Sequence, residues 1–141
     1  MSLATVFAPV FVQVALTFAL LFWAGGVRVG AVRTGAVKMR DVALGQPNWP
    51  ARAMQITNAY QNQLELPVLF YLLVTIAFFT AHMTATLVVL SWLFVLSRLL
   101  HALIHVTTNE VRRRFFVFAA GAMILLLMWV LYLLDVVFGG P

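Results

Sequence analysis

The sequence predicts an all-α membrane protein, a four-transmembrane-helix bundle whose successive helices run up and down. Of its 141 residues, 64% are hydrophobic and 9% are charged, and the mean hydropathy is +1.02. Soluble domains are about half apolar and about a quarter charged, and nine basic plus four acidic side chains cannot cover a soluble domain of this size. The composition therefore excludes a soluble globule, a disordered chain and a nucleic-acid-binding module.

Long apolar runs separate the basic residues and give the positions of the helices. No basic residue occurs in the first 27 positions, between Arg52 and Arg98, or after Arg114. The runs do not alternate with polar residues, as the strands of an outer-membrane barrel would. A spanning helix needs about 20 apolar residues, so we expect helices over 4–30, 53–81, 83–107 and 111–138 in one domain, 1–141. The first run lacks the basic start and cleavage site of a signal peptide.

The connections between these helices carry the topology signal. Gly45, Pro47 and Pro50 mark residues 35–50 as a loop. Shorter connections are expected near His82 and over 107–110, where Asn109 is a candidate cap for the last helix. The basic loop residues all fall on the side of the first and third connections. The positive-inside bias therefore predicts that loops 31–52 and 107–114 are cytoplasmic and that both termini lie outside.

Polar residues recur at helical spacing inside two of the predicted helices. The second helix carries five on one broad face, and the third carries three at i, i+3 and i+7: Arg52, Gln55, Asn58, Asn62 and Glu65, then Arg98, His101 and His105. Ionisable groups within a membrane normally face protein or water and are paired. Glu65 and Arg98 are lone opposite charges, so we expect an interhelical pair, which suits either a structural role or a functional site.

Other chemistry is constrained by what the sequence lacks. There are no cysteines, so any thiol chemistry must use a bound thiol rather than a protein nucleophile. His101 and His105 have a spacing that suits zinc, but no third ligand follows, and we expect no metal site. The small residues 119–122 favour close approach of the last helix to a neighbour.

Three segments carry a resemblance to a known family. Asn-Ala-Tyr-Gln-Asn-Gln-Leu-Glu-Leu-Pro over 58–67, Arg-Leu-Leu-His over 98–101 and the basic run 112–114 resemble the MAPEG family, the membrane-associated proteins in eicosanoid and glutathione metabolism. Nearest are bacterial members whose activity is mostly unassigned. The resemblance covers nearly the whole chain, and it implies a homotrimer in a bacterial inner membrane with active sites between subunits, open toward the cytoplasm.

The resemblance also implies roles for individual residues. Glutathione would be the bound thiol, with an arginine stabilising its thiolate, either Arg114 (preferred) or Arg112. Glu65 would contact the glutathione ammonium group beside Asn62. The full set of implied glutathione contacts lies on the two polar faces: Arg52, Asn58, Asn62, Glu65, Arg98, His101 and His105. The implied activity is a transferase or peroxidase acting on lipophilic electrophiles.

Two positions depart from the family pattern. Asn58 stands where an arginine is usual, four residues before Asn62, and His105 stands where members acting on eicosanoids have a tyrosine. Arg52 is a candidate to compensate for the missing charge at Asn58. These departures keep open an alternative, a non-catalytic lipid-binding or scaffold member of the same family. A purely structural role for the polar face is a third interpretation.

Overall fold

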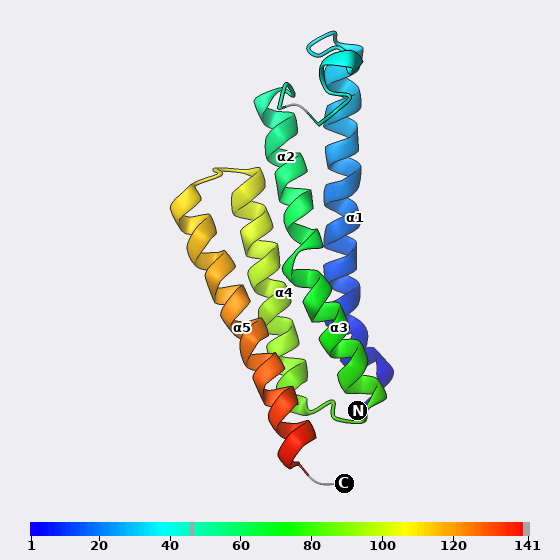
Figure 1. Ribbon diagram of the computed structural model, residues 1–141, viewed down its shortest axis with the longest axis vertical. Coiled ribbons are helices and arrows are strands. Elements are labelled where there is room, and N and C mark those ends of the chain that lie inside the picture. Colours follow the sequence, from blue (N-terminus) through cyan, green and yellow to red (C-terminus); the bar gives the residue numbers. More distant parts are fainter. Residues whose placement is uncertain (46, 140–141) are drawn as a thin grey trace.

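The computed structural model is an all-helical chain with four long apolar spans that run up and down (Figure 1). It describes residues 1–45 and 47–139, so Gln46 of the predicted first loop and Gly140 and Pro141 of the predicted domain lie outside the described residues. The spans are Leu3–Arg33, Ala51–Phe79, Ala85–Val106 and Val111–Phe138, of 31, 29, 22 and 28 residues. Each exceeds the about 20 residues that cross a bilayer, as the expected four-helix membrane bundle requires.

Helix boundaries follow from local capping chemistry. Helix α1 (Leu3–Arg33) begins after Ser2, whose hydroxyl accepts a hydrogen bond from the Thr5 N–H at 3.2 Å. Helix α4 (Ala85–Val106) begins in the same way after Thr84. Such caps satisfy N–H groups that have no partner within the helix. Helix α5 (Val111–Phe138) begins instead after Glu110, without a side-chain cap, so the expected capping role of Asn109 is wrong.

The second span is broken, whereas the sequence predicted one continuous helix over 53–81. Helix α2 (Ala51–Gln61) tightens into the short helix η2 (Asn62–Leu64), and α3 (Leu66–Phe79) resumes after Glu65, whose φ of −98° and ψ of −102° are not helical. The cause is Pro67, which has no N–H to donate to the carbonyl four residues earlier and whose ring clashes there. The break lies at the predicted polar face.

Two apolar clusters hold the bundle together, one on each side of this break. The first, around Phe70 and Phe94, joins α1, α3, α4 and α5. The second, around Ile56 and Ala102, joins α1, α2 and α4. Between them Gln13 of α1 donates a hydrogen bond to Gln63 at 3.0 Å, and both side chains are buried. This polar contact ties α1 to the broken segment.

The two ends of the bundle differ in character. The start of α1, the end of α5 and the 80–84 connection lie at one end, and the 34–50 and 107–110 connections lie at the other (Figure 1). The second end carries every loop arginine and lysine. Large apolar side chains cover much of the outer surface of the spans, which is the surface that an integral membrane protein presents to lipid.

Candidate functional site

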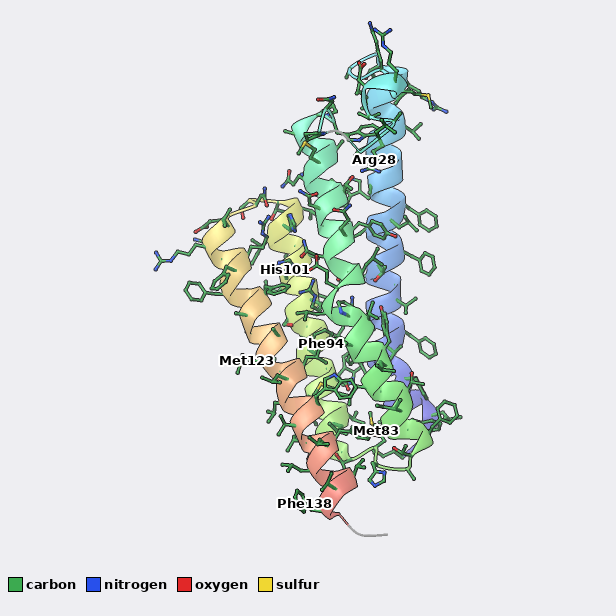
Figure 2. The ribbon with its side chains drawn as sticks, in the orientation of Figure 1. Arg28, Met83, Phe94, His101, Met123 and Phe138 are labelled. Atoms are coloured by element: carbon green, nitrogen blue, oxygen red, sulfur yellow. The ribbon has the colours of Figure 1, made fainter. Side chains whose placement is uncertain are left out.

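A polar cavity of about 260 Å³ lies where the broken span faces α4 and the first turns of α5. Seven residues line it: Asn62, Glu65, His101, Val111, Arg114, Phe115 and Phe118. Figure 2 shows His101 on α4, in the half of the bundle toward the 107–110 connection. The cavity brings together four of the residues predicted from the two polar faces and the basic run.

Arg98 lies fully buried behind this cavity and is held by the backbone of the broken span. One of its terminal nitrogens donates a hydrogen bond to the Asn62 carbonyl at 3.0 Å. The last carbonyls of a helix lack partners within the helix and carry the negative end of its dipole. Asn62 is the C-cap residue of α2, so Arg98 caps the end of α2, at the break that Pro67 causes.

The Arg98 guanidinium keeps unused donors. Its Nε and its other terminal nitrogen are buried and have no hydrogen-bond partner in the described residues. Its carbon lies 5.5 Å from the centre of the Phe118 ring, a cation–π contact. The ring of His101 also packs on Phe118, with centres 5.7 Å apart, and its buried Nδ1 has no partner in the part of the chain described. Buried polar atoms without partners mark a place for a ligand or water.

The predicted Glu65–Arg98 pair is not a direct ion pair in the described residues, although the two charges interact at longer range. Glu65 forms no ion pair within 4 Å in the described structure, and its side chain is exposed at the mouth of the cavity. The prediction paired the two charges because no other side-chain charge was near, but a backbone carbonyl serves Arg98 instead. The carboxylate of Glu65 is therefore free to accept from a bound group.

The basic run at the start of α5 divides into three different environments. Arg114 lines the cavity, half-buried, and donates a hydrogen bond to the Asn109 side-chain oxygen at 2.6 Å. Arg113 pairs with Glu110 at 2.8 Å on the surface. Arg112 is exposed and is not among the lining residues. Of the two candidates for a thiolate partner, Arg114 is the one at the cavity.

The N-terminal part of the polar face predicted for the second helix, Arg52, Gln55 and Asn58, does not line the cavity. Arg52 donates to the Val106 carbonyl at 2.6 Å, and Gln55 donates to the His105 carbonyl at 2.7 Å, so both bind the end of α4. Asn58 is exposed one turn before Asn62, and its carbonyl accepts a hydrogen bond from the Asn62 amide at 2.8 Å. Arg52 and Gln55 therefore tie α2 to the end of α4.

The two histidines lie side by side on α4. Their ring centres are 5.7 Å apart and the rings are nearly perpendicular, but only His101 lines the cavity. No group of three or more His, Cys, Asp or Glu side chains is arranged to hold a metal ion within residues 1–45 and 47–139. The expected absence of a metal remains a prediction.

Four residues of the site were missed from the sequence: Val111, Phe115, Phe118 and Asn109. Val111, Phe115 and Phe118 stand at i, i+4 and i+7 with Arg114 between them, so they share one face of α5. The sequence contains this spacing, but it does not stand out because nearly all residues of the segment are apolar. Asn109 gave no comparable signal, because its contact with Arg114 depends on a backbone φ of +51°.

Comparison with known proteins supports the resemblance noted in the sequence. A model of the MAPEG family matches residues 6–134, nearly the whole chain. Comparisons with curated proteins and with solved structures gave no significant match. The matched range contains every residue that lines the polar cavity.

Proposed function

Because the chain belongs to the MAPEG family, which includes glutathione transferases and peroxidases, we propose that it is a glutathione-dependent transferase or peroxidase for lipophilic electrophiles. One observation carries the proposal. The Glu65 carboxylate and the half-buried Arg114 line one cavity, and Arg98, which has unused buried donors, packs against its lining residues Asn62 and Phe118.

The side chains fit the groups of glutathione, which has an ammonium, two carboxylates and a thiol. Glu65 makes no ion pair in the described structure, so its carboxylate suits the ammonium group. Asn62 lines the same cavity, and the guanidinium of Arg98 behind it has buried donors without partners in the described chain. Charge-assisted hydrogen bonds of this kind are about twice as strong as neutral ones.

Bound glutathione would supply a thiolate, the nucleophile that attacks an electrophile or reduces a peroxide. A thiol has an ordinary pKa of about 8.5, and a nearby fixed cation lowers it. Arg114 supplies such a cation from the first turn of α5, where the positive end of the helix dipole adds to its charge. The hydrogen bond from Arg114 to Asn109 holds the guanidinium in place.

The remaining walls of the cavity suit an apolar second substrate. Val111 and Phe115 are 66% and 62% exposed, and Phe118 lies deeper. An electrophile dissolved in the bilayer would reach these side chains laterally, while glutathione would enter from the side of the loops. We further propose a homotrimer in a bacterial inner membrane, with the 31–52 and 107–114 loops cytoplasmic, in which a second subunit closes the open mouth beside Glu65.

The proposal is tested with the purified full chain, reduced glutathione and a model aryl halide. Glutathione at several millimolar should raise the unfolding temperature, and conjugation should exceed the rate in buffer. Arg114→Gln should lower the conjugation rate by about 10²-fold, as loss of a charge-stabilising donor does, and Arg112→Gln should leave it within about twofold. Absence of stabilisation by glutathione, or equal effects of the two variants, would overturn the proposal.

A non-catalytic member that holds a lipid is the second candidate. Asn58 favours it, because this neutral side chain stands where an arginine is usual for the family and would bind a glutathione carboxylate. The same preparation separates the two candidates. A non-catalytic member should show no thiol-dependent turnover and no stabilisation by glutathione.

A further inference from the structure

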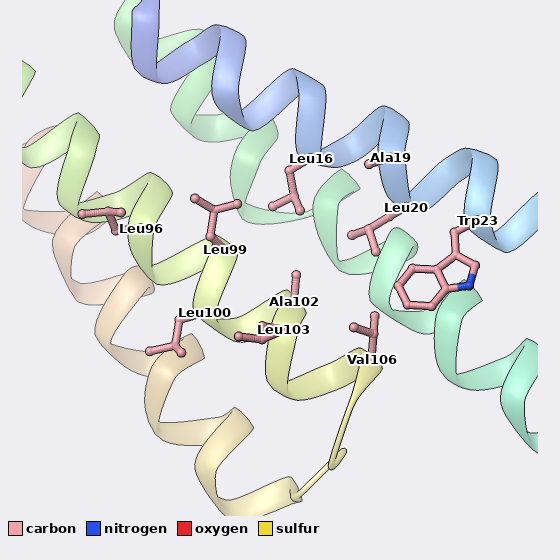
Figure 3. A pocket seen from close by; sticks show the side chains of 10 residues that line it. All are labelled: Leu16, Ala19, Leu20, Trp23, Leu96, Leu99, Leu100, Ala102, Leu103 and Val106. Carbon is pink, nitrogen blue, oxygen red and sulfur yellow. The ribbon is translucent and has the colours of Figure 1, made fainter.

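A larger cavity, of about 570 Å³, lies between α1 and α4 and is lined almost wholly by apolar side chains (Figure 3). Helix α1 supplies one wall and α4 the other: Leu16, Ala19, Leu20 and Trp23, then Leu96, Leu99, Leu100, Ala102, Leu103 and Val106. We refer to it as the α1–α4 groove. It shares no lining residue with the polar cavity.

The groove has a packed floor and an open rim. Leu20, Ala102 and Val106 of the floor belong to the second core cluster and are buried. Leu96 and Leu103 at the rim are 54% and 57% exposed. Both helices are long and apolar enough to span the membrane, and we infer that the rim faces the hydrocarbon of the bilayer, where an apolar chain is the natural occupant.

One end of the groove carries a cation. The guanidinium carbon of Arg52 lies 5.3 Å from the centre of the Trp23 ring, and one terminal nitrogen donates to the Val106 carbonyl at 2.6 Å. Trp23 and Val106 are both lining residues. The same nitrogen also donates to Gln55 at 3.1 Å. The Nε and the other terminal nitrogen of Arg52 have no protein partner among the described residues, and the side chain is exposed.

We propose that the α1–α4 groove binds an acyl chain of an anionic phospholipid, with the headgroup phosphate on the free donors of Arg52. Arginine presents a planar fork of donors that matches phosphate oxygens. Basic pockets between transmembrane helices at the cytoplasmic face recognise anionic headgroups in this way. An apolar slot that ends in an exposed guanidinium is complementary to an amphiphile with a negative head.

Charge complementarity argues against a second copy of this chain as the occupant. A second copy would have to bring an acidic side chain to Arg52, and the sequence has four. Asp41 and Glu110 already pair with Arg40 and Arg113. Asp135 lies at the opposite end of the bundle, and Glu65 lies at the polar cavity. An anionic lipid headgroup supplies the negative charge at Arg52 that a second copy of the chain does not.

The test uses the purified full chain without any thiol, so its outcome is independent of the proposed transferase activity. The protein in mild detergent is mixed with phosphatidylglycerol and phosphatidylcholine of identical acyl chains, and retained lipid is counted by native mass spectrometry. We expect a preference for phosphatidylglycerol of about fivefold, which corresponds to about 1 kcal/mol for one basic residue. Equal retention of the two lipids would overturn the proposal.

Substitutions at Arg52 and at Ala19, each with a control, test the headgroup contact and the acyl-chain contact separately. Arg52→Gln should abolish the preference, whereas Arg52→Lys should keep most of it, and Arg33→Gln, an exposed arginine that does not line the groove, should keep all of it. Ala19→Phe fills the groove from an exposed position and should remove both lipids. Ala15→Phe, one turn away on α1 and outside the lining, is its control. Wild-type retention by Ala19→Phe would contradict the proposal.

A cross-linking experiment tests the competing occupant. The chain has no cysteine, so Leu103→Cys introduces a single thiol at the rim of the groove. We expect a maleimide reagent to label this thiol in the assembled protein, and a short bifunctional maleimide to leave the subunits separate. Efficient cross-linking between copies through this position would show a protein in the groove and overturn the lipid assignment.

Discussion

Replacing Asn109 tests whether the loop before α5 determines the position of the cavity arginine. The Asn109 side-chain oxygen accepts a hydrogen bond from Arg114 at 2.6 Å, and its N–H donates to the Ile104 carbonyl at 2.8 Å. Its φ of +51° lies in the left-handed region, which asparagine and glycine adopt more readily than other residues. Asn109→Gly keeps that backbone and removes the side-chain acceptor, and Asn109→Ala removes the acceptor and also strains the backbone.

The structure gives the size of each effect. The Asn109–Arg114 hydrogen bond is charge-assisted but only partly buried, so its loss should cost about 1 kcal/mol. Holding alanine in the left-handed region should cost about 1 kcal/mol more. The free energy of unfolding should therefore decrease in the order wild type, Asn109→Gly, Asn109→Ala. Both variants remove the hydrogen bond to Arg114, so they should change the pKa of a bound thiol by the same amount.

The assay measures ionisation of glutathione bound to each variant, from the ultraviolet absorbance of the thiolate as pH is raised. Released from Asn109, Arg114 stabilises the thiolate less, so the pKa of the bound thiol should rise by about half to one unit, since one unit equals 1.36 kcal/mol. In the Arg114→Gln background the Asn109→Gly substitution should produce no further rise. The two residues should thus be coupled in a double-mutant cycle.

Two results would refute this reasoning. One is a bound-thiol pKa that stays at the wild-type value in both Asn109 variants although Arg114→Gln raises it, which would mean that Asn109 does not hold the arginine in its active position. The other is a pKa that rises in Asn109→Ala only. That outcome would trace the effect to backbone strain in the loop and not to the lost hydrogen bond.

Three further predictions follow from other contacts. Glu65→Gln should weaken glutathione binding about tenfold by calorimetry without lowering the unfolding temperature, because Glu65 is exposed and makes no ion pair in the described structure; a large fall in that temperature would contradict this. Gln13→Leu should lower the free energy of unfolding by about 0.6 kcal/mol, because the buried Gln63 side-chain oxygen loses its donor. Adding Gln63→Leu to the same chain should restore the lost stability, and an equal loss in the double variant would refute the pairing. Gly121→Ala should destabilise the α4–α5 contact, because a Cβ there would lie 2.5 Å from the Ser97 hydroxyl oxygen. With Ser97→Ala the same change should be neutral or stabilising, and thermal unfolding of all four chains checks this.

The spans and part of the site could be predicted because they depend on composition and helical spacing alone. Apolar runs between charged segments are sufficient to find membrane helices. Asn62 and Glu65 were expected on one face because residues at i and i+3 share a face in any helix, and both line the polar cavity together with His101 of α4. The close approach of α5 to α4 at Gly121 followed in the same way from a small residue in an otherwise bulky helix.

The partners within the site could not be predicted, because they involve backbone groups and loop geometry. Arg98 uses the Asn62 carbonyl, whose availability depends on the non-helical Glu65. Arg52 lies on the predicted face but turns toward Trp23 and away from the polar cavity. A pattern of side chains along a helix gives the direction of each residue but does not show which carbonyls a break in that helix leaves free.

Pro67 links the break in the second span to the chemistry of the cavity. A lone guanidinium inside a membrane protein is costly to bury, and it needs a compensating charge or acceptor. The break supplies one, since the end of α2 brings the carbonyl of its C-cap residue Asn62 and the negative end of the helix dipole to Arg98. This single contact leaves the other Arg98 donors without partners in the described residues, and they lie beside a cavity that also holds Glu65. A full Glu65–Arg98 ion pair would have neutralised both groups, so the broken helix is what keeps a carboxylate and a guanidinium available to a ligand.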